Sequence, residues 1–212
     1  MARNRLKNLT ARAQENAVAD DKYKVHEEDT PLIDVVNELK NTDSFEISME
    51  TPDALLPYPD KGIRLGLHTG FKRDTLKESI QQDGIIEPCI IWVREGERLI
   101  LAGHNRVDIA RELHISVPCI IRTDLDIKKA ERIVIITNLQ NRQLHEMKPS
   151  ELSRMLTRLI AGYDNSVYKS EIYEEINDEF SLTRTKVLWY LKINTLNTYL
   201  LEMLDNGDMP LT

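Results

Sequence analysis

The residues best suited to chemistry lie at one corner of the sequence, Gly103-His104-Asn105-Arg106. An apolar run over 99–102 predicts a buried strand that stops at Gly103, and a helical pattern follows over 104–113. A helix N-terminus presents free backbone N–H groups and the positive end of its dipole, so this corner suits an anion such as phosphate. The same residues also fit a polar turn in which Arg106 is solvated or pairs with a nearby carboxylate such as Glu112.

Charge and composition limit the classes of partner. The 212 residues hold 28 Lys and Arg against 35 Asp and Glu, which gives a formal net charge of -7. No global basic field attracts nucleic acid, so any contact with DNA must be local. The sequence shows neither an apolar stretch of membrane-spanning length nor a signal peptide, which predicts a cytoplasmic protein with no membrane contact.

The two cysteines occupy nearly identical settings, because Cys89 and Cys119 each follow a proline and precede two isoleucines. Both are typical of small apolar residues in buried strands within a reducing compartment. Neither has a metal-type spacing, and the five histidines form no ligand cluster.

The chain divides into three parts by composition. Residues 1–46 predict a mobile tail with a basic start, residues 47–146 a small mixed α/β domain, and residues 147–212 an all-helical domain, so the fold class is α+β. Within the α/β part the patterns predict strands over 85–93, 98–102 and 117–121 and helices over 74–82 and 126–140.

The helical part predicts a helix-turn-helix. Pro149 suits the first position of one helix, Ser170 can cap a second, residues 177–182 form a turn, and Thr183 can cap a third helix. A last helix ends at Gly207.

The helix from Thr183 would read DNA with the face opposite its apolar residues. Arginine can take a guanine edge, lysine and threonine can reach phosphates, and Lys169 and Ser170 would add phosphate contacts from the preceding helix. The exposed face holds Arg184, Thr185, Lys186, Leu188, Trp189 and Lys192. An ordinary exposed helix is the alternative, and seven basic against seven acidic residues over 148–192 do not decide between them.

The order of motifs resembles the ParB partition-protein family from about residue 54 to residue 209. One box, the segment 84–91, matches Gly-(hydrophobic)₂-Gln-Pro with Glu87 in place of Gln. The corner at Gly103 matches Gly-Glu-Arg-Arg or Gly-His-Arg-Arg. The segment 138–151 is similar to the third box, and the segment 183–207 to the recognition helix and the helices behind it.

The resemblance implies a CTP-dependent DNA clamp that acts in plasmid or chromosome partition. The α/β domain would bind CTP and Mg²⁺, the helix-turn-helix would read a palindromic double-stranded site, and the protein would be a homodimer on nucleoid or plasmid DNA. The tail would contact a ParA-type ATPase. The residues implied for nucleotide are Gly103, His104, Asn105 and Arg106 for the triphosphate, Asn138 and Arg142 for phosphates with Asn138 on the metal, and Ile90 and Ile91 near the base.

Two departures from the family pattern affect these expectations. Asn105 replaces an arginine, and the metal-binding glutamate of the third box is Thr137 or Ile136, so hydrolysis should be slow or absent while binding persists. The chain also ends soon after Gly207, where the family continues into a dimerisation domain.

Three other classes compete. Sulfiredoxin shares the fold by resemblance, but its catalytic cysteine corresponds to His104, which argues against a redox enzyme. A nuclease would need clustered carboxylates, and the boxes offer none. A helix-turn-helix transcriptional regulator with a degenerate, nucleotide-free ParB-like domain remains the alternative.

Overall fold

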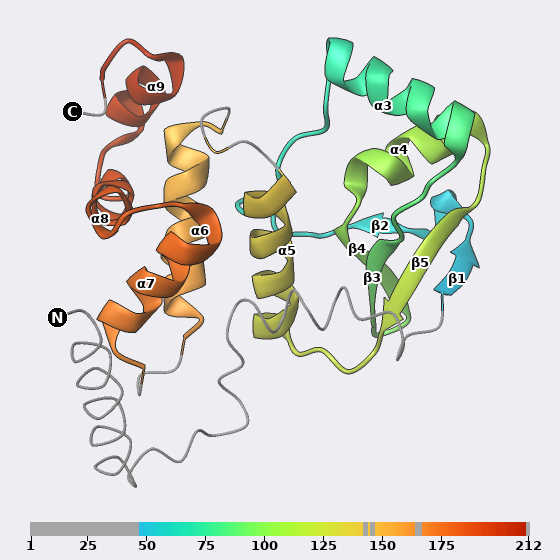
Figure 1. Cartoon of the computed structure of the whole chain (residues 1–212), viewed down its shortest axis with the longest axis horizontal. Coiled ribbons are helices and arrows are strands. Elements are labelled where there is room, and N and C mark those ends of the chain that lie inside the picture. The colour runs from blue at the N-terminus through green and yellow to red at the C-terminus, as the bar shows by residue number, and fades with distance from the viewer. Residues whose placement is uncertain (1–46, 142–143, 145–146, 164–166, 211–212) are drawn as a thin grey trace, which may run out of the picture. The chain divides into compact units, whose positions relative to one another are not determined.

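The computed structural model describes residues 47–141, 144, 147–163 and 167–210. The described chain begins with an α/β part (Figure 1). Its strands are β1 (Ile47–Glu50), β2 (Leu56–Pro57), β3 (Cys89–Arg94), β4 (Glu97–Ala102) and β5 (Val117–Arg122). Its helices are the 3-10 turn η2 (Pro52–Ala54), α3 (Gly70–Asp83), α4 (His104–Leu113) and α5 (Ile127–Asn141).

The five strands form one sheet in the order β1-β5-β3-β4-β2. The pair β3 and β4 is an antiparallel hairpin, and its two-residue turn has positive φ at both Glu95 (53°) and Gly96 (86°), as tight hairpins require. The central strands β3 and β5 are parallel, so the chain between them crosses over through α4. The expected mixed α/β class is confirmed.

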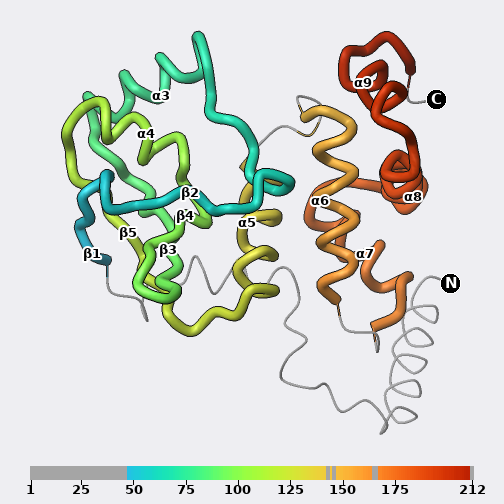
Figure 2. The backbone as a smooth tube through the Cα atoms, turned by 180° about the vertical axis from the view of Figure 1, so that it is seen from behind, coloured from blue at the N-terminus to red at the C-terminus, as the bar shows by residue number. Residues whose placement is uncertain are grey.

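Alternate residues of β3 pack on opposite faces of the sheet, as the pleat requires. Cys89 and Ile91 join the apolar cluster beneath α4, whereas Ile90 and Trp92 join the cluster that contains α5. The backbone tube shows the same sheet from behind (Figure 2). Helices therefore cover both faces of the sheet.

The rest of the described chain is helical, with short connections. Its helices are α6 (Pro149–Ala161), α7 (Lys169–Phe180), α8 (Arg184–Ile193) and α9 (Thr198–Asn206). The α6 helix buries Leu152, Met155, Leu156 and Leu159, the stripe that its spacing predicts. No helix in the described ranges is both long and apolar enough to cross a membrane.

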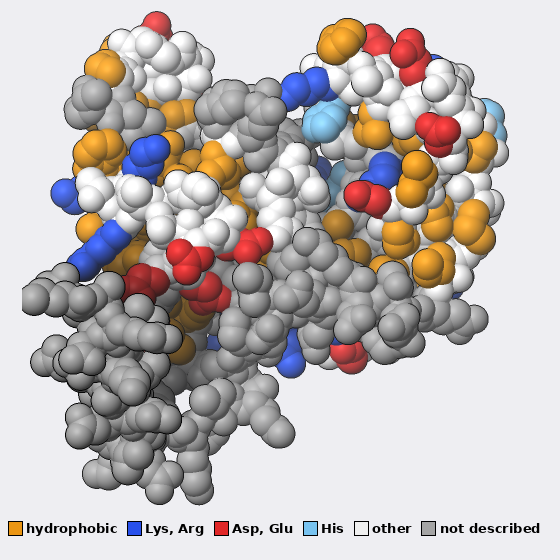
Figure 3. All heavy atoms as spheres, in the orientation of Figure 1, with side chains coloured by type: hydrophobic (Ala, Val, Ile, Leu, Met, Phe, Trp, Pro, Cys, Tyr) orange, Lys and Arg blue, Asp and Glu red, His pale blue; other side chains and the backbone are white. Residues whose placement is uncertain are grey.

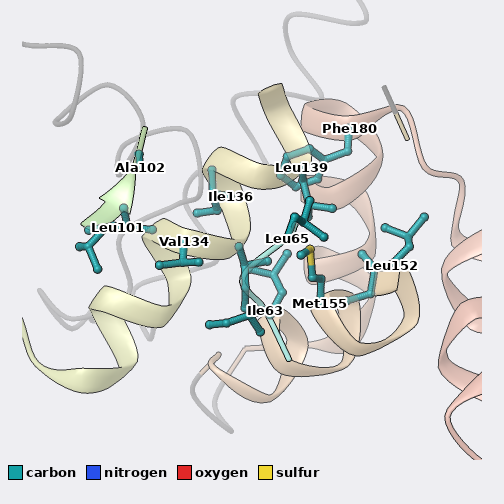
Figure 4. Packing of buried hydrophobic residues seen from close by; sticks show 14 of the residues in the cluster. Ile63, Leu65, Leu101, Ala102, Val134, Ile136, Leu139, Leu152, Met155 and Phe180 are labelled. Carbon is teal, nitrogen blue, oxygen red and sulfur yellow. The ribbon is translucent and has the colours of Figure 1, made fainter. Parts of the chain in front are cut away.

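One apolar cluster runs from the sheet through α5 into α6, α7 and α8. Val134, Ile136 and Leu139 of α5 lie between Leu101 of β4 and Met155 of α6 (Figure 4). The cluster thus crosses the expected domain boundary at residue 147, and that boundary stays a prediction.

Polar contacts join α5 to α7 alongside this cluster. The guanidinium of Arg132 lies 4.6 Å from the Tyr163 ring centroid and 3.9 Å from a Glu175 carboxylate oxygen. The Tyr163 hydroxyl donates a hydrogen bond to the same carboxylate at 2.8 Å. Gln140 donates another to Glu179. The α5 helix is therefore held on the α7 side by charge as well as by apolar packing.

Several expected boundaries were wrong for local reasons. The strand expected from residue 85 begins at Cys89, because Pro88 has no N–H to donate to a ladder. The helix expected from residue 74 begins at Gly70. The turn expected over 177–182 shortens, since Phe180 lies one turn after Ile176 and both are buried, so α7 continues to Phe180.

Candidate nucleotide corner and candidate DNA-reading helix

Gly103 forms the corner between β4 and α4. It has φ 99° and ψ 20°, and a Cβ built there would lie 2.4 Å from Cys89 Sγ, so the corner has room only for glycine. The first helix hydrogen bond runs from Val107 N–H to Gly103 C=O at 3.0 Å. The amides of residues 104–106 precede that bond and mark the positive end of α4, as an anion site needs.

Arg106 is a side chain of this corner, and it holds the loop that leads into β3. Its guanidinium donates to the carbonyls of Glu87 and Pro88, the latter at 3.4 Å, and lies 3.5 Å from the Glu87 carboxylate. Glu112 instead pairs with Arg73 at 2.8 Å and with Lys77. The carboxylate beside Arg106 is therefore Glu87, and its side chain, 81% exposed, can turn away from an incoming anion.

Asn105 and Asn138 both anchor the segment that precedes α3. The Asn105 side-chain oxygen accepts a hydrogen bond from His68 N–H at 2.7 Å, and the Asn138 amide donates to Ile63 C=O at 3.0 Å. The structure thus gives each a structural partner, and their contacts with phosphate or metal stay predictions. No periodic signal in the sequence points to either bond.

His104 is the first residue of α4, and its ring is largely buried. Its Nε2 atom has no hydrogen-bond partner in the described part of the chain. Burial, with smaller effects from Arg64 and Arg111, lowers the pKa of His104 from 6.5 to about 4. The imidazole is neutral at pH 7, and it leaves one polar atom at the corner unsatisfied. Arg64, to which no motif in the sequence points, adds a cation near this ring.

The buried histidine makes stability depend on pH. Between about pH 6.5 and pH 4 the unfolded chain binds a proton that the folded chain does not, so the free energy of unfolding falls as the pH falls. We expect the parent to lose about 2 kcal/mol at pH 5 relative to pH 7 through this group. The H104Q variant should lack this loss in urea unfolding at both pH values. Equal pH dependence of parent and variant would contradict the buried neutral ring.

At the position where the family has its metal-binding glutamate, this chain has no side-chain oxygen free to bind a metal ion. The Thr137 hydroxyl donates to Ile133 C=O at 2.8 Å within its own helix, and Ile136 is fully buried. No group of three or more His, Cys, Asp or Glu residues that could hold a metal ion occurs among the described residues. The corner therefore fits a phosphate group, whereas its residues do not by themselves make an Mg²⁺ site.

Other expected nucleotide residues have different positions. Ile90 and Ile91 are 8% and 0% exposed and face opposite sides of the sheet, so neither offers much surface beside a base in this conformation. Arg142 lies outside the described residues, as do the basic residues of the tail at Arg3, Arg5 and Arg12. Their roles remain predictions.

The second candidate site is α8, which follows α7 after a tight turn. Ser181 ends α7 with φ 55° and ψ 31°, and the Thr183 side chain caps α8 by accepting from Lys186 N–H at 3.5 Å. The expected cap at Thr183 is confirmed. The expected cap at Ser170 is wrong, because α7 already begins at Lys169 and Tyr168 is its N-cap.

The α8 helix buries Val187 and exposes the face expected to read DNA. The exposed residues are Arg184, Thr185, Lys186, Leu188, Trp189 and Lys192. The Arg184 guanidinium lies 5.6 Å from the centroid of the buried Tyr173 ring, which favours a defined position for a long cation. Lys169 and Ser170 are exposed on the first turn of α7. Two helices joined by a tight turn, with the second helix accessible, are consistent with the predicted helix-turn-helix.

Charges on the two helices differ sharply. The α8 helix has three cationic side chains and no carboxylate, and it is the only helix in the described ranges without one. The α7 helix carries Glu171, Glu174, Glu175, Asp178 and Glu179. Figure 3 shows blue side chains near α8 and red ones gathered over α7. Of these two helices, α8 and the first residue of α7 therefore carry the cations that could meet DNA phosphates.

No family model matches the sequence. It is 24% identical over 149 residues to the "Probable chromosome-partitioning protein ParB" of Helicobacter pylori, covering 69% of this chain and 47% of that protein. The chain thus spans about half the length of the curated relative that it matches.

Two solved structures share the fold. One is C-terminally truncated ParB of Caulobacter crescentus complexed to the centromeric parS site, with 19% identity, a TM-score of 0.55 and coverage of 77% of this chain and 80% of that chain. The other is a Pnob8-like ParB-N domain, with 20% identity, a TM-score of 0.53 and coverage of 79% and 77%.

The shared architecture defines the class, a ParB-N type α/β part followed by helices. The sequence relative is likewise a ParB protein, at 24% identity.

Proposed function

We propose that this chain is a ParB-like protein of chromosome or plasmid partition that binds CTP at the Gly103 corner and a palindromic DNA site through α8. The corner carries the proposal. Gly103 has a positive φ and no room for a Cβ there. The free amides of the first turn of α4 lie beside it, together with the buried His104 Nε2 atom, which has no partner among the described residues. Arg106 and Arg64 add positive charge to the same corner. A triphosphate offers acceptor oxygens to the amides and to the guanidinium groups, and to His104 Nε2 in the tautomer that carries its proton on that atom.

In this proposal some residues of the corner bind the nucleotide and others position the neighbouring segment. The amides of residues 104–106 and the Arg106 guanidinium hold phosphate oxygens, while Asn105 and Asn138 keep the 63–68 segment in place. On the resemblance, bound nucleotide would bring the α/β parts of two chains together around DNA. The choice of cytosine as the base is likewise taken from the resemblance.

Titration of labelled CTP into the chain, with and without DNA, tests the proposal. The duplex is one recovered by selection from a random-sequence library, and its scrambled form is the control. We expect saturable CTP binding that ATP does not displace, and tighter binding of the selected duplex than of the scrambled one by fluorescence anisotropy. No CTP binding in either condition would remove the nucleotide half of the proposal.

One observation favours a second candidate, a helix-turn-helix regulator that binds no nucleotide. Arg106 is already engaged by the carbonyls of Glu87 and Pro88 and by the Glu87 carboxylate. If those contacts persist in solution, the corner presents its amides without its arginine. Sequence-specific DNA binding with no response to CTP would support this candidate.

Turnover should be slow even where nucleotide binds. Mg²⁺ prefers carboxylate oxygens, and the Thr137 hydroxyl already donates a hydrogen bond to a backbone carbonyl of its own helix. We expect phosphate release close to background with CTP, Mg²⁺ and the selected duplex, and a measurable increase in T137E. Rapid release by the parent, dependent on Mg²⁺ and on DNA, would show that another group serves the metal.

The remaining partners follow from the resemblance. We propose a homodimer on DNA and a ParA-type ATPase that contacts the tail. Deletion of residues 1–20 should abolish ATPase stimulation and leave binding of CTP and DNA intact.

A further inference from the structure

The middle of the exposed face of α8 is apolar. Thr185, Leu188, Trp189 and Lys192 follow the spacing i, i+3, i+4 and i+7, so they lie in one stripe opposite the fully buried Val187. Leu188 is 37% exposed and Trp189 is 46% exposed. A stripe of this kind on a buried helix would be core, but here it faces outward.

Cations border this stripe on both sides. At 3.6 residues per turn, Arg184 and Lys186 point to either side of Thr185, roughly 100° away from it around the helix axis. No carboxylate lies on α8 to compete with them. The face therefore has an apolar centre between two cations, with Lys192 at its far end.

This charge pattern matches a DNA groove better than a protein surface. The phosphates form two negatively charged walls, and the base edges lie between them. A helix that enters the major groove places its flanks toward the walls and its centre toward the bases. The cations of α8 then meet phosphates, and Leu188 and Trp189 meet base edges.

Only one base presents a methyl group in the major groove. Thymine has its C5-methyl group there beside the O4 acceptor, whereas the other bases are read there through hydrogen-bond donors and acceptors. A leucine has no polar atom to offer those edges, and the tryptophan indole offers a single donor. A base donor or acceptor packed against Leu188 would lose its water without gaining a hydrogen bond, and this would weaken binding.

We propose that Leu188 and Trp189 read thymine methyl groups, so that the bound half-site carries thymines where the centre of α8 meets the bases. The inference rests on the proposed function, in which α8 enters the major groove. It also shifts sequence discrimination away from Arg184 and toward the second turn of the helix.

Replacing single thymines by deoxyuridine tests this without altering the protein. The duplex is the one selected above, and each substitution removes one methyl group and leaves pairing unchanged. We expect about a three- to fivefold loss of affinity at one or two positions per half-site and no loss elsewhere. The L188A and W189A variants should bind the thymine duplex more weakly and should no longer distinguish thymine from uracil at those positions.

K186A is the matched control on the same helix. It should weaken binding to thymine and uracil duplexes alike and reduce the salt dependence. Parent protein that prefers the selected duplex but binds its uracil forms equally well would overturn the proposal and leave the proposed function standing. W189A and L188A binding as tightly as the parent would overturn it too, and would point to a protein partner for this face. No preference for selected over scrambled DNA would overturn both this proposal and the proposed sequence-specific DNA binding.

Discussion

The G103A variant is expected to unfold with a free energy about 2–4 kcal/mol lower than the parent. Two effects add. A positive φ of 99° costs a residue with a Cβ about 1 kcal/mol, and the added methyl group must displace Cys89, whose Sγ would lie 2.4 Å away. Urea unfolding followed by circular dichroism measures the difference.

Gly96 provides the matched control. Its φ is 86°, yet a Cβ there meets nothing within 4 Å, so G96A isolates the backbone effect and should cost about 1 kcal/mol. Adding C89A to G103A should restore part of the loss, because it removes the sulfur atom that the new methyl group meets. Equal costs for G103A and G96A would show that Cys89 can move aside, and the tight corner would then need another explanation.

The second large effect concerns the nucleotide. R106A should weaken CTP binding at least tenfold, because it removes a charge-assisted contact of about 1.5–3 kcal/mol from the proposed phosphate site. Isothermal titration with CTP measures the change. A variant that binds CTP as tightly as the parent would exclude Arg106 from the site.

Two further variants separate a phosphate contact from a structural role. Glu87 competes for Arg106, so E87Q should bind CTP at least as tightly as the parent. R73A removes two ion pairs between α3 and α4, with Asp108 and with Glu112, without touching the corner, and it should leave CTP affinity unchanged. If R73A weakened binding as much as R106A, general loosening of α4 would account for both.

The sequence predicted those features that depend on neighbouring residues. Gly103 begins a helix and Gly207 ends one where expected, because a glycine with positive φ makes a corner or stops a helix by itself. The apolar stripes of α6 and α8 were predicted for the same reason, because each depends on the spacing of residues within one helix. Pro88 shortened β3 from within the predicted strand, and its effect was available in the sequence.

The features that were missed depend on residues far apart in the chain. The two-residue strand β2 exists because it pairs with β4. The hydrogen bond from His68 to Asn105 spans 37 residues, and that from Asn138 to Ile63 spans 75. Side chains that a resemblance assigns to a ligand can be held by such distant partners, and no local pattern reveals it.

The α5 helix gives the chain a property that bears on how it can be studied. Its apolar residues face β4 on one side and Met155 on the other, while Arg132 and Gln140 contact the α7 side. Cutting the chain after residue 146 would leave those residues in water, and a fragment of either half would be prone to aggregate. Assays of the separate halves would then measure the effect of newly exposed apolar residues. The dependence of DNA binding on nucleotide is therefore best studied with point variants of the intact chain.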